Sequence, residues 1–279
     1  MMKKFWKNAN SRLKSGLIIT AFFLFIGFIV YYIPHANPFT YNTYPEKLMP
    51  SFQHWLGTTS MGQDVMWLLI ESIHNSLLIG LIVATIGTVV GVFVGLLAGF
   101  SGGAVDRILT VVTDTFVVIP SLPILILMTS LMKGSSTVIL MALVLAMFAW
   151  AWPSRQIRSM ALTIKERDFI HTAWFSGEGT FQVVATEILP YALTWSLSNF
   201  MNATLSAIAS ESSLAVLGLS PANLISLGNM IQWARDRNAI FAGQWFWIGS
   251  PIIATVLLFI GLFLLITGYN DYLSMKRGK

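Results

Sequence analysis

Residues 155–190 read RQIRSMALTIKERDFIHTAWFSGEGTFQVVATEILP. This segment is rich in charged residues, whereas the sequence on either side of it is apolar and nearly uncharged. Over the 279 residues of the chain, 55% are hydrophobic and only 10% are charged, compared with roughly a quarter charged in soluble domains. A soluble protein with so few charges could not cover its surface. The contrast therefore indicates a water-exposed segment between membrane-embedded ones.

Apolar runs long enough to cross a membrane surround this segment. A helix needs about 20 apolar residues to span the hydrocarbon layer. Six stretches qualify: residues 16–33, 76–100, 108–132, 135–152, 191–219 and 245–269. Lipid offers no partner to backbone amides and carbonyls, so each span must be a helix or a barrel strand. Because these runs are too long for strands, the sequence predicts an all-α membrane protein with six transmembrane helices.

The basic residues predict the orientation of these spans. With the N-terminus inside, 13 of the 17 Lys and Arg residues fall on the inner side. The four on the outer side are Lys47, Lys133, Arg235 and Arg237. Excess positive charge marks the cytoplasmic side, so both termini and residues 155–190 are predicted to be cytoplasmic. The chain then divides into a cytoplasmic segment 1–15, a first span with an extracytoplasmic segment 16–75, and a core domain 76–275 that contains the loop.

Small residues in the second span predict close helix packing. Glycine recurs every fourth position there, at Gly87, Gly91, Gly95 and Gly99. This spacing places the four residues on one helix face, where the missing side chains let another helix approach. The pattern indicates packing and carries no chemistry.

Two spans contain a carboxylate. Asp114 lies in the third span, before Pro120 and Pro123, and Glu211 lies in the fifth. The prolines predict a kink because they interrupt the backbone hydrogen bonds of a helix. A carboxylate within the membrane is costly and normally faces the bundle interior or a water-filled path. Asp114 and Glu211 therefore either line a translocation path or sit at a helix interface, held there by hydrogen bonds.

The outer segments leave two questions open. Residues 65–76, VMWLLIESIHNS, are amphipathic and either lie along the membrane surface or begin the second span early. Trp233, Trp245 and Trp247 flank the last span. They are typical of an aromatic belt at the membrane interface, and contact with a ligand is the alternative.

Within residues 155–190, two short helices are predicted. Phe169, Ile170, Ala173 and Trp174 share one helix face, and the Ser-Gly-Glu-Gly run at 176–179 ends this helix because glycine favours the turn that follows a helix end. In the second helix the apolar stripe is formed by Phe181, Val184 and Ile188, and the helix stops at Pro190. Such stripes either pack on the ends of the chain's own membrane helices or enter a groove of a partner.

Several functional classes lack support in the sequence. The only Gly-Lys pair is Gly278-Lys279, so no phosphate-binding loop is present and energy must come from another polypeptide. The chain has no cysteine, and the four histidines are not spaced as metal ligands. The net charge of +5 is explained by membrane orientation rather than by nucleic acid. We therefore predict that the chain is not an enzyme and binds no cofactor or metal itself.

The central segment resembles the cytoplasmic loop of the permeases of ABC importers, whose pattern is EAA-x3-G-x9-I-x-L-P. Ala173, Gly177, Leu189 and Pro190 occupy the matching positions, between the fourth and fifth of six spans. His171 stands at the usual acidic position and Thr172 at the first alanine. In that family the short helix of the loop docks into the ATP-binding subunit.

Further motifs resemble one branch, the second permease of systems that import peptides, nickel or oligosaccharides. His54-Trp55-Leu56-Gly57-Thr58 followed by Gly62-Gln63-Asp64-Val65 is similar to HWLGTD-x2-GRDV. The other similar motifs are Ser76-Leu77 with Ile79-Gly80, residues 98–103 with Asp106, Asp114 with Pro120, Glu211 with Leu214 and residues 217–219, and Gly228 with Met230. The resemblance covers residues 50–275.

The resemblance implies a permease subunit of an ATP-driven importer in the cytoplasmic (inner) membrane, with a type I importer fold. Its implied partners are a homologous second permease, two ATP-binding subunits that carry ATP and magnesium, and an extracytoplasmic substrate-binding protein. The implied cargo is oligopeptides or oligosaccharides. Coupling to the ATPase is assigned to the loop 164–190, at Phe169, His171, Thr172, Ala173, Gly177, Leu189 and Pro190.

Two other functions remain open from the residues alone. A secondary transporter would show internal repeats and broken helices at matched positions, and no convincing repeat relates residues 16–132 to residues 135–269. An intramembrane enzyme would use Asp114 and Glu211 as paired carboxylates, although their predicted depths in the membrane differ.

Overall fold

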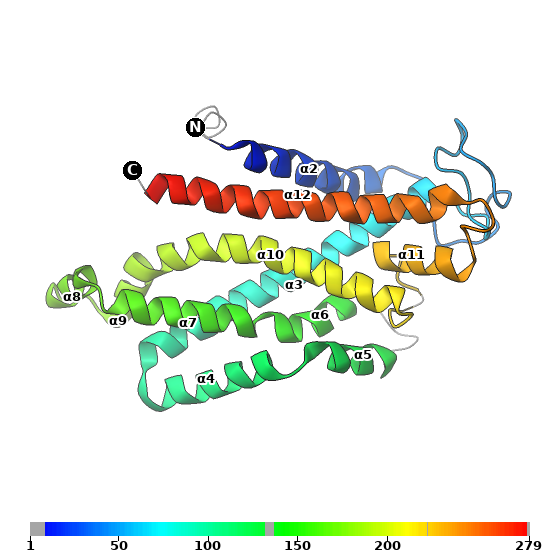
Figure 1. The fold of residues 1–279 in the computed structure, drawn as a ribbon. Helices are drawn as coiled ribbons and strands as arrows, with labels where there is room; N and C mark the ends of the chain where they lie inside the picture. The colour runs from blue at the N-terminus through cyan, green and yellow to red at the C-terminus, as the bar shows by residue number, and fades with distance from the viewer. Residues whose placement is uncertain (1–8, 132–136, 222, 278–279) are drawn as a thin grey trace.

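The computed structural model describes residues 9–131, 137–221 and 223–277. Within these ranges the regular structure is helical, apart from one isolated β-bridge between Thr58 and Asp64. Figure 1 shows long helices lying side by side in an elongated bundle. The prediction of an all-α protein is confirmed. Residues 132 and 135, where the third span was predicted to end and the fourth to begin, lie outside the described residues, as do Lys133 and most of the segment 1–15.

The long helices follow one another along the chain. They are α2 (Ser11–Phe28), α3 (Val65–Ser101), α4 (Gly103–Val118), α5 (Ser121–Leu131), α6 (Val138–Ala149), α7 (Ala151–Lys165), α10 (Leu189–Val216), α11 (Leu227–Asp236) and α12 (Trp245–Arg277). The short elements are η1 (Val30–Tyr32), α8 (Asp168–Phe175), α9 (Thr180–Val183) and a π-helical turn, η2 (Val184–Ile188).

Among the described residues, four helical segments are long and apolar enough to cross a membrane: α2 with η1, α3, α6 with α7, and α12. A fifth span results if α4 and α5, which meet at a bend of 78°, are counted together. Helix α10 has 28 residues but falls below this level of apolarity because it carries many serine, threonine and asparagine residues. The chain is thus a multi-pass membrane protein, and the number of six spans stays a prediction.

Helix α3 is the centre of the bundle and packs against α7, α10, α6 and α2. Its glycine stripe lies against α6 and α7: a Cβ atom added to Gly91 would lie 2.6 Å from Cβ of Pro153, and one added to Gly95 2.5 Å from the Ser154 carbonyl oxygen. The predicted close approach is confirmed. The helix begins at Val65, so residues 65–76 start the second span early and the alternative of a surface-lying segment is wrong.

The third predicted span is not one kinked helix but two. Helix α4 ends at Val118, Ile119 adopts an extended conformation with ψ of 124°, and α5 begins at Ser121. A proline disfavours the helical conformation of the residue before it. Pro120 therefore ends α4 completely.

The burial of Trp247 contradicts its predicted place in an aromatic belt at the membrane interface. Its side chain is only 1% exposed and packs in a cluster with Leu68 and Met230. Trp233 is partly buried against the same cluster, whereas Trp245 is 61% exposed. Of the three tryptophans, only Trp245 has the exposure that a belt residue needs.

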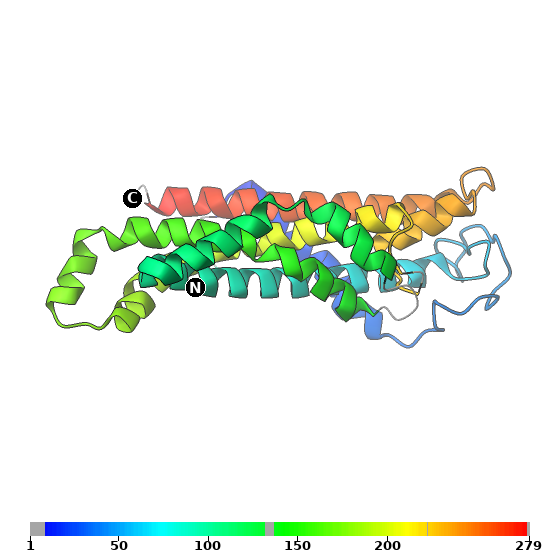
Figure 2. The same cartoon turned by 90° about the horizontal axis from the view of Figure 1, so that it is seen from below.

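The connections segregate to the two ends of the bundle (Figures 1 and 2). The start of α2, the end of α12, the junction of α3 with α4, and the α8–α9 region lie at one end. The segment 33–64 and α11 lie at the other. Residues 155–190, the start of α2 and the end of α12 are therefore grouped together, as the orientation prediction requires. We call the end with the α8–α9 region the inner end, and the end with α11 the outer end.

Candidate functional site

The charged segment is only partly a separate helix-turn-helix. Residues 155–165 belong to α7, which continues from α6 and packs along α3. Ile157 and Ala161 of α7 are fully buried, and a Cβ atom on Gly99 would lie 2.8 Å from Cβ of Ala161. The glycine stripe thus holds the first turns of the predicted loop inside the bundle. The projecting part is confined to residues 166–188.

The turn after α8 depends on Gly177. The amide of Gly177 donates to the Trp174 carbonyl at 3.0 Å, and the amide of Glu178 donates to the Ala173 carbonyl at 3.2 Å. These two bonds satisfy carbonyls that a helix end leaves without partners. Gly177 has φ of 87°, in the left-handed region where a side chain is disfavoured. The predicted helix end at residues 176–179 is confirmed.

The base of this projection packs on the bundle. Ile170, Val183 and Ile188 are fully buried, against Leu96, Phe100 and Ile164 among others. Ala173 and Trp174 also pack against this cluster, as predicted. Phe181 does not, because its side chain is 87% exposed. Val183 takes the buried position instead of Phe181, since the π-helical turn η2 interrupts the α-helical spacing on which the predicted stripe depended.

The seven residues assigned to coupling all lie on or beside this projection. Phe169, His171, Thr172, Gly177 and Pro190 are exposed, while Ala173 and Leu189 are partly buried. The Thr172 hydroxyl donates to the Asp168 carbonyl at 3.0 Å, and the His171 ring lies edge-on to Trp174. Leu189 and Pro190 form the first turn of α10. Pro190 was wrongly predicted to stop a helix, because it lies in the first turn of α10, directly after the π-helical turn η2, and the helical run continues through it.

Two exposed phenylalanines were missed by the sequence-based assignment. Phe175 is 93% exposed at the end of α8, and Phe181 is 87% exposed at the start of α9. Phe175 follows Ile170 by five positions, which places it about 140° away around the helix. Helical spacing alone therefore indicated that Phe175 lies off the buried stripe.

Asp114 lies on α4 and faces α7. Its carboxylate is 3.8 Å from Nη1 of Arg155, and both side chains are about half exposed, at 47% and 59%. One end of α4 is held more firmly, since Arg158 Nε and Nη2 donate to both carboxylate oxygens of Asp106 at 2.6 and 2.8 Å. These two ion pairs fasten α4 to α7.

Glu211 has different surroundings. It is fully buried in α10, where the Ser226 hydroxyl donates to its Oε1 at 2.6 Å, and no described residue hydrogen-bonds to its Oε2. The Ser226 hydroxyl also accepts from the amide of Asn229, at the start of α11. The structure therefore does not pair Glu211 with Asp114. The geometry of Glu211 is that of a carboxyl held at a helix interface.

A polar face of α10 was also missed. Asn202, Ser206 and Ser210 line a cleft of about 310 Å³ between α10 and the helices α5, α6 and α7. Their four-residue spacing puts them on one helix face. This spacing could have been found in the sequence, as that of the glycines was.

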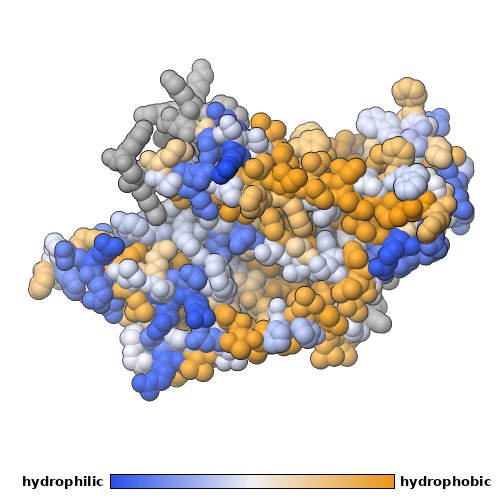
Figure 3. Space-filling model, in the orientation of Figure 1, coloured by the Kyte–Doolittle hydropathy of each residue, from blue (hydrophilic) through white to orange (hydrophobic). Residues whose placement is uncertain are grey.

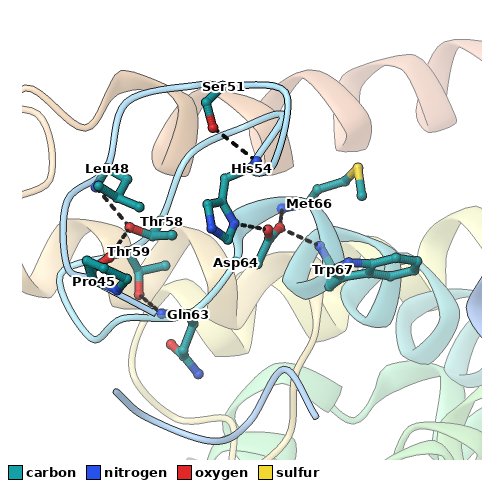
Figure 4. Close-up of polar contacts among 10 residues, drawn as sticks. All are labelled: Pro45, Leu48, Ser51, His54, Thr58, Thr59, Gln63, Asp64, Met66 and Trp67. Atoms are coloured by element: carbon teal, nitrogen blue, oxygen red, sulfur yellow. Dashed lines mark hydrogen bonds and ion pairs between the residues drawn. The ribbon is translucent and has the colours of Figure 1, made fainter. Parts of the chain in front are cut away.

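The motif at residues 54–65 forms a folded cap at the outer end of α3 (Figure 4). The Asp64 carboxylate accepts from the amides of Met66 and Trp67 at 2.9 and 3.3 Å, and it pairs with Nδ1 of His54 at 2.7 Å. Gln63, which replaces the arginine of the resembling motif, donates from Nε2 to the Pro38 carbonyl at 2.7 Å. These buried contacts order the segment and begin the helix.

Known proteins resemble the chain over nearly its whole length. The oligopeptide transport system permease protein OppC of Mycobacterium tuberculosis H37Rv is 28% identical, over 89% of this chain and 87% of that protein. OppC of Lactococcus lactis subsp. cremoris SK11 is 28% identical over 90% and 87%. The dipeptide transport system permease protein DppC of Bacillus subtilis is 28% identical over 96% and 82%.

The family comparison covers the end of α3 and the helices that follow it. Residues 91–279 match the model of the family described as the binding-protein-dependent transport system inner membrane component. The matched range includes α4 to α12, and therefore both the α8–α9 projection and the polar cleft. The chain belongs to this family of transport permeases, and the resemblance to permease subunits of ABC importers is confirmed.

Proposed function

We propose that this chain is one of two homologous permease subunits of an ATP-driven peptide importer in the cytoplasmic membrane. The relatives named as oligopeptide and dipeptide permeases support peptides as the cargo. An extracytoplasmic binding protein delivers the cargo to the outer end. Two partner subunits bind ATP and magnesium, because the chain has no phosphate-binding loop. The α8–α9 projection receives the movement of one of them.

The observation that carries this proposal is the uneven exposure of the projection. Its base is anchored on the bundle through Ile170 and Ile188, which are fully buried. Its tip exposes Phe175 and Phe181, which are 93% and 87% accessible. The projection lies at the inner end, beyond the other helices (Figure 2). Large exposed aromatic side chains on an anchored support are typical of residues that fill a partner's pocket.

The anchoring explains how docking at the tip can move the membrane helices. Ile170 of α8 packs in one cluster with Leu96 and Phe100 of α3. The α9 helix runs through η2 directly into α10, without a loop between them. A displacement of the tip is therefore transmitted to α3 and α10 through packed contacts and continuous helix.

The test compares a double variant of two phenylalanines with a single control variant, in the importer assembled in vesicles with its ATPase subunits and binding protein. Replacing Phe175 and Phe181 with alanine is expected to reduce peptide uptake about tenfold or more, since deeply inserted aromatic side chains dominate many interfaces. ATP hydrolysis should lose its dependence on the binding protein. The control is Phe263→Ala, because Phe263 is 60% exposed but lies in the middle of α12, away from both ends of the bundle. Unchanged uptake in the Phe175 and Phe181 double variant would contradict the proposal.

A further inference from the structure

A cleft beside α10 has a mixed polar and apolar lining. Its volume is about 310 Å³. Helix α10 contributes Asn202, Ser206 and Ser210, and also Asn199, whose amide donates to the Thr88 hydroxyl at 3.2 Å. Phe148 of α6 and Trp152 of α7 form part of the opposite wall. Figure 3 shows pale and blue atoms on the face between α12 and α4, with orange atoms above and below.

Most polar side chains of α10 outside this cleft have partners within the protein. The Ser196 hydroxyl donates to the Ala192 carbonyl at 2.6 Å, and the Thr204 hydroxyl to the Phe200 carbonyl at 2.9 Å. By contrast, the side chains of Asn202, Ser206 and Ser210 hydrogen-bond to no described residue, and they lie on the same face. A bare amide or hydroxyl is costly in lipid. This face therefore favours water, a polar ligand or polar groups of a neighbouring helix over lipid.

The chemistry of the cleft is uncharged. The described residues that line it include no Asp, Glu, Lys, Arg or His. Glu211 follows Ser210 directly, but its side chain is buried toward Ser226. Asparagine and serine offer both donors and acceptors, and the rings of Phe148 and Trp152 offer apolar surface. Such a lining suits neutral hydrogen-bonding groups, such as peptide amides or sugar hydroxyls.

We propose that Asn202, Ser206 and Ser210 line this chain's part of the translocation path. The cargo contacts them through its uncharged amide or hydroxyl groups, and this chain does not select for the charge of the cargo. The inference rests on the proposed importer function and adds to it the residues of the path. A partner helix or lipid in the cleft is the competing occupant.

The first test measures access of water to the cleft in the assembled importer. The chain contains no cysteine, so Ser206→Cys carries a single thiol. The control is Leu197→Cys, which lies about half a turn away around the helix and is 48% exposed outside the cleft. A quaternary-ammonium methanethiosulfonate should modify Ser206→Cys about tenfold faster, because the thiolate that reacts forms only in water. Its modification should also block uptake. Equal, slow modification of both variants would show that lipid or a partner helix fills the cleft, and would overturn the inference.

The second test measures selection by charge. Ser206→Asp adds a carboxylate to the neutral cleft, and Ser206→Asn is the uncharged control. Relative to wild type, Ser206→Asp should raise the uptake ratio of trilysine to triglutamate about tenfold, since unpaired like charges in a narrow site are strongly disfavoured. Ser206→Asn should leave the ratio unchanged. An unchanged ratio in Ser206→Asp, with uptake intact, would overturn the inference.

Wild-type controls separate this inference from the proposed function. ATP-dependent uptake of trialanine supports the peptide importer and identifies amides as the groups that cross the cleft. Uptake of maltotriose in place of trialanine would assign sugar hydroxyls instead and contradict peptides as the cargo. If the wild-type importer transports neither compound, the proposed function fails, whatever the variants show.

Discussion

The ring of Phe169 in α8 stacks against the ring of Tyr191 at the start of α10, with centroids 6.5 Å apart and planes 27° apart. This contact joins the projection at the inner end to the helix that lines the polar cleft. The same helix continues to Ser206 and Ser210 without a break. The candidate partner site and the candidate cargo site are therefore joined by a packed ring contact and one continuous helix.

The turn after α8 gives a first prediction. Gly177→Ala places a side chain at φ of 87°, which costs about 1–2 kcal/mol and loosens the turn between the two exposed phenylalanines. We expect less uptake for each ATP hydrolysed, measured in reconstituted vesicles. The matched control is Gly179→Ala, because Gly179 has φ of −72° and open space around it. Equal coupling in both variants would show that the geometry of this turn is unimportant.

Packing of α3 gives a second prediction. In Gly95→Ala the new Cβ would lie 2.5 Å from the Ser154 carbonyl oxygen, so α3 and α7 must separate. We expect a loss of about 1–3 kcal/mol in the free energy of unfolding, typical of overpacking. Thermal unfolding in detergent measures it. Gly249→Ala, in α12 with no atom within 4 Å of the added Cβ, should unfold at the wild-type temperature or above. A wild-type melting temperature for Gly95→Ala would contradict the close packing.

The two ion pairs between α4 and α7 should differ in strength. Arg158 donates twice to Asp106 and both side chains are largely covered, at 29% and 20% exposure. Arg158→Gln is expected to lower the free energy of unfolding by about 1.5–3 kcal/mol, as for hydrogen bonds to charged groups. Arg155→Gln should lower the free energy of unfolding by only about 0–1 kcal/mol, because Arg155 and Asp114 are half exposed and 3.8 Å apart. Chemical denaturation of the two variants side by side tests the order, and a larger loss for Arg155→Gln would reverse it.

Glu211 provides a test between a path residue and an interface residue. Glu211→Gln keeps an oxygen that accepts from Ser226, so the protein should fold and transport normally. Glu211→Leu removes the acceptor and leaves the buried Ser226 hydroxyl without it, at a cost of about 1–3 kcal/mol. Melting temperature and uptake are measured for both variants. Loss of uptake in a stable Glu211→Gln variant would show that the charge itself acts on the cargo.

The sequence predicted the features that depend on long apolar runs and regular spacing. The all-helical bundle, the close helix packing at the glycine stripe, and the turn at Gly177 follow from residue types whose conformational effects are local. The positions of Ile170, Ala173 and Trp174 also followed from simple helical spacing.

Several features were mispredicted from the sequence. Because of the π-helical turn η2, Val183 is buried where Phe181 was expected to be. The residues of η2 show no pattern from which this turn was predicted. Pro190 was expected to stop a helix but lies in the first turn of α10, and the helical run continues through it. Trp247 was placed in a belt but fills a core between α3, α11 and α12. For Trp247 the neighbours in space determined the outcome.

The central claim is that the tip of the projection docks on an ATPase subunit, and cysteine protection tests it most directly. Because the chain has no native cysteine, Phe175→Cys and Phe241→Cys each carry one thiol, at the inner and outer ends. Labelling by a water-soluble maleimide is compared for each variant with and without the ATPase subunits, in permeabilised vesicles. We expect assembly to slow labelling at position 175 about tenfold or more, as for a fully desolvated interface residue, and to leave position 241 unaffected. Equal labelling of position 175 in the presence and absence of the ATPase subunits would contradict the account.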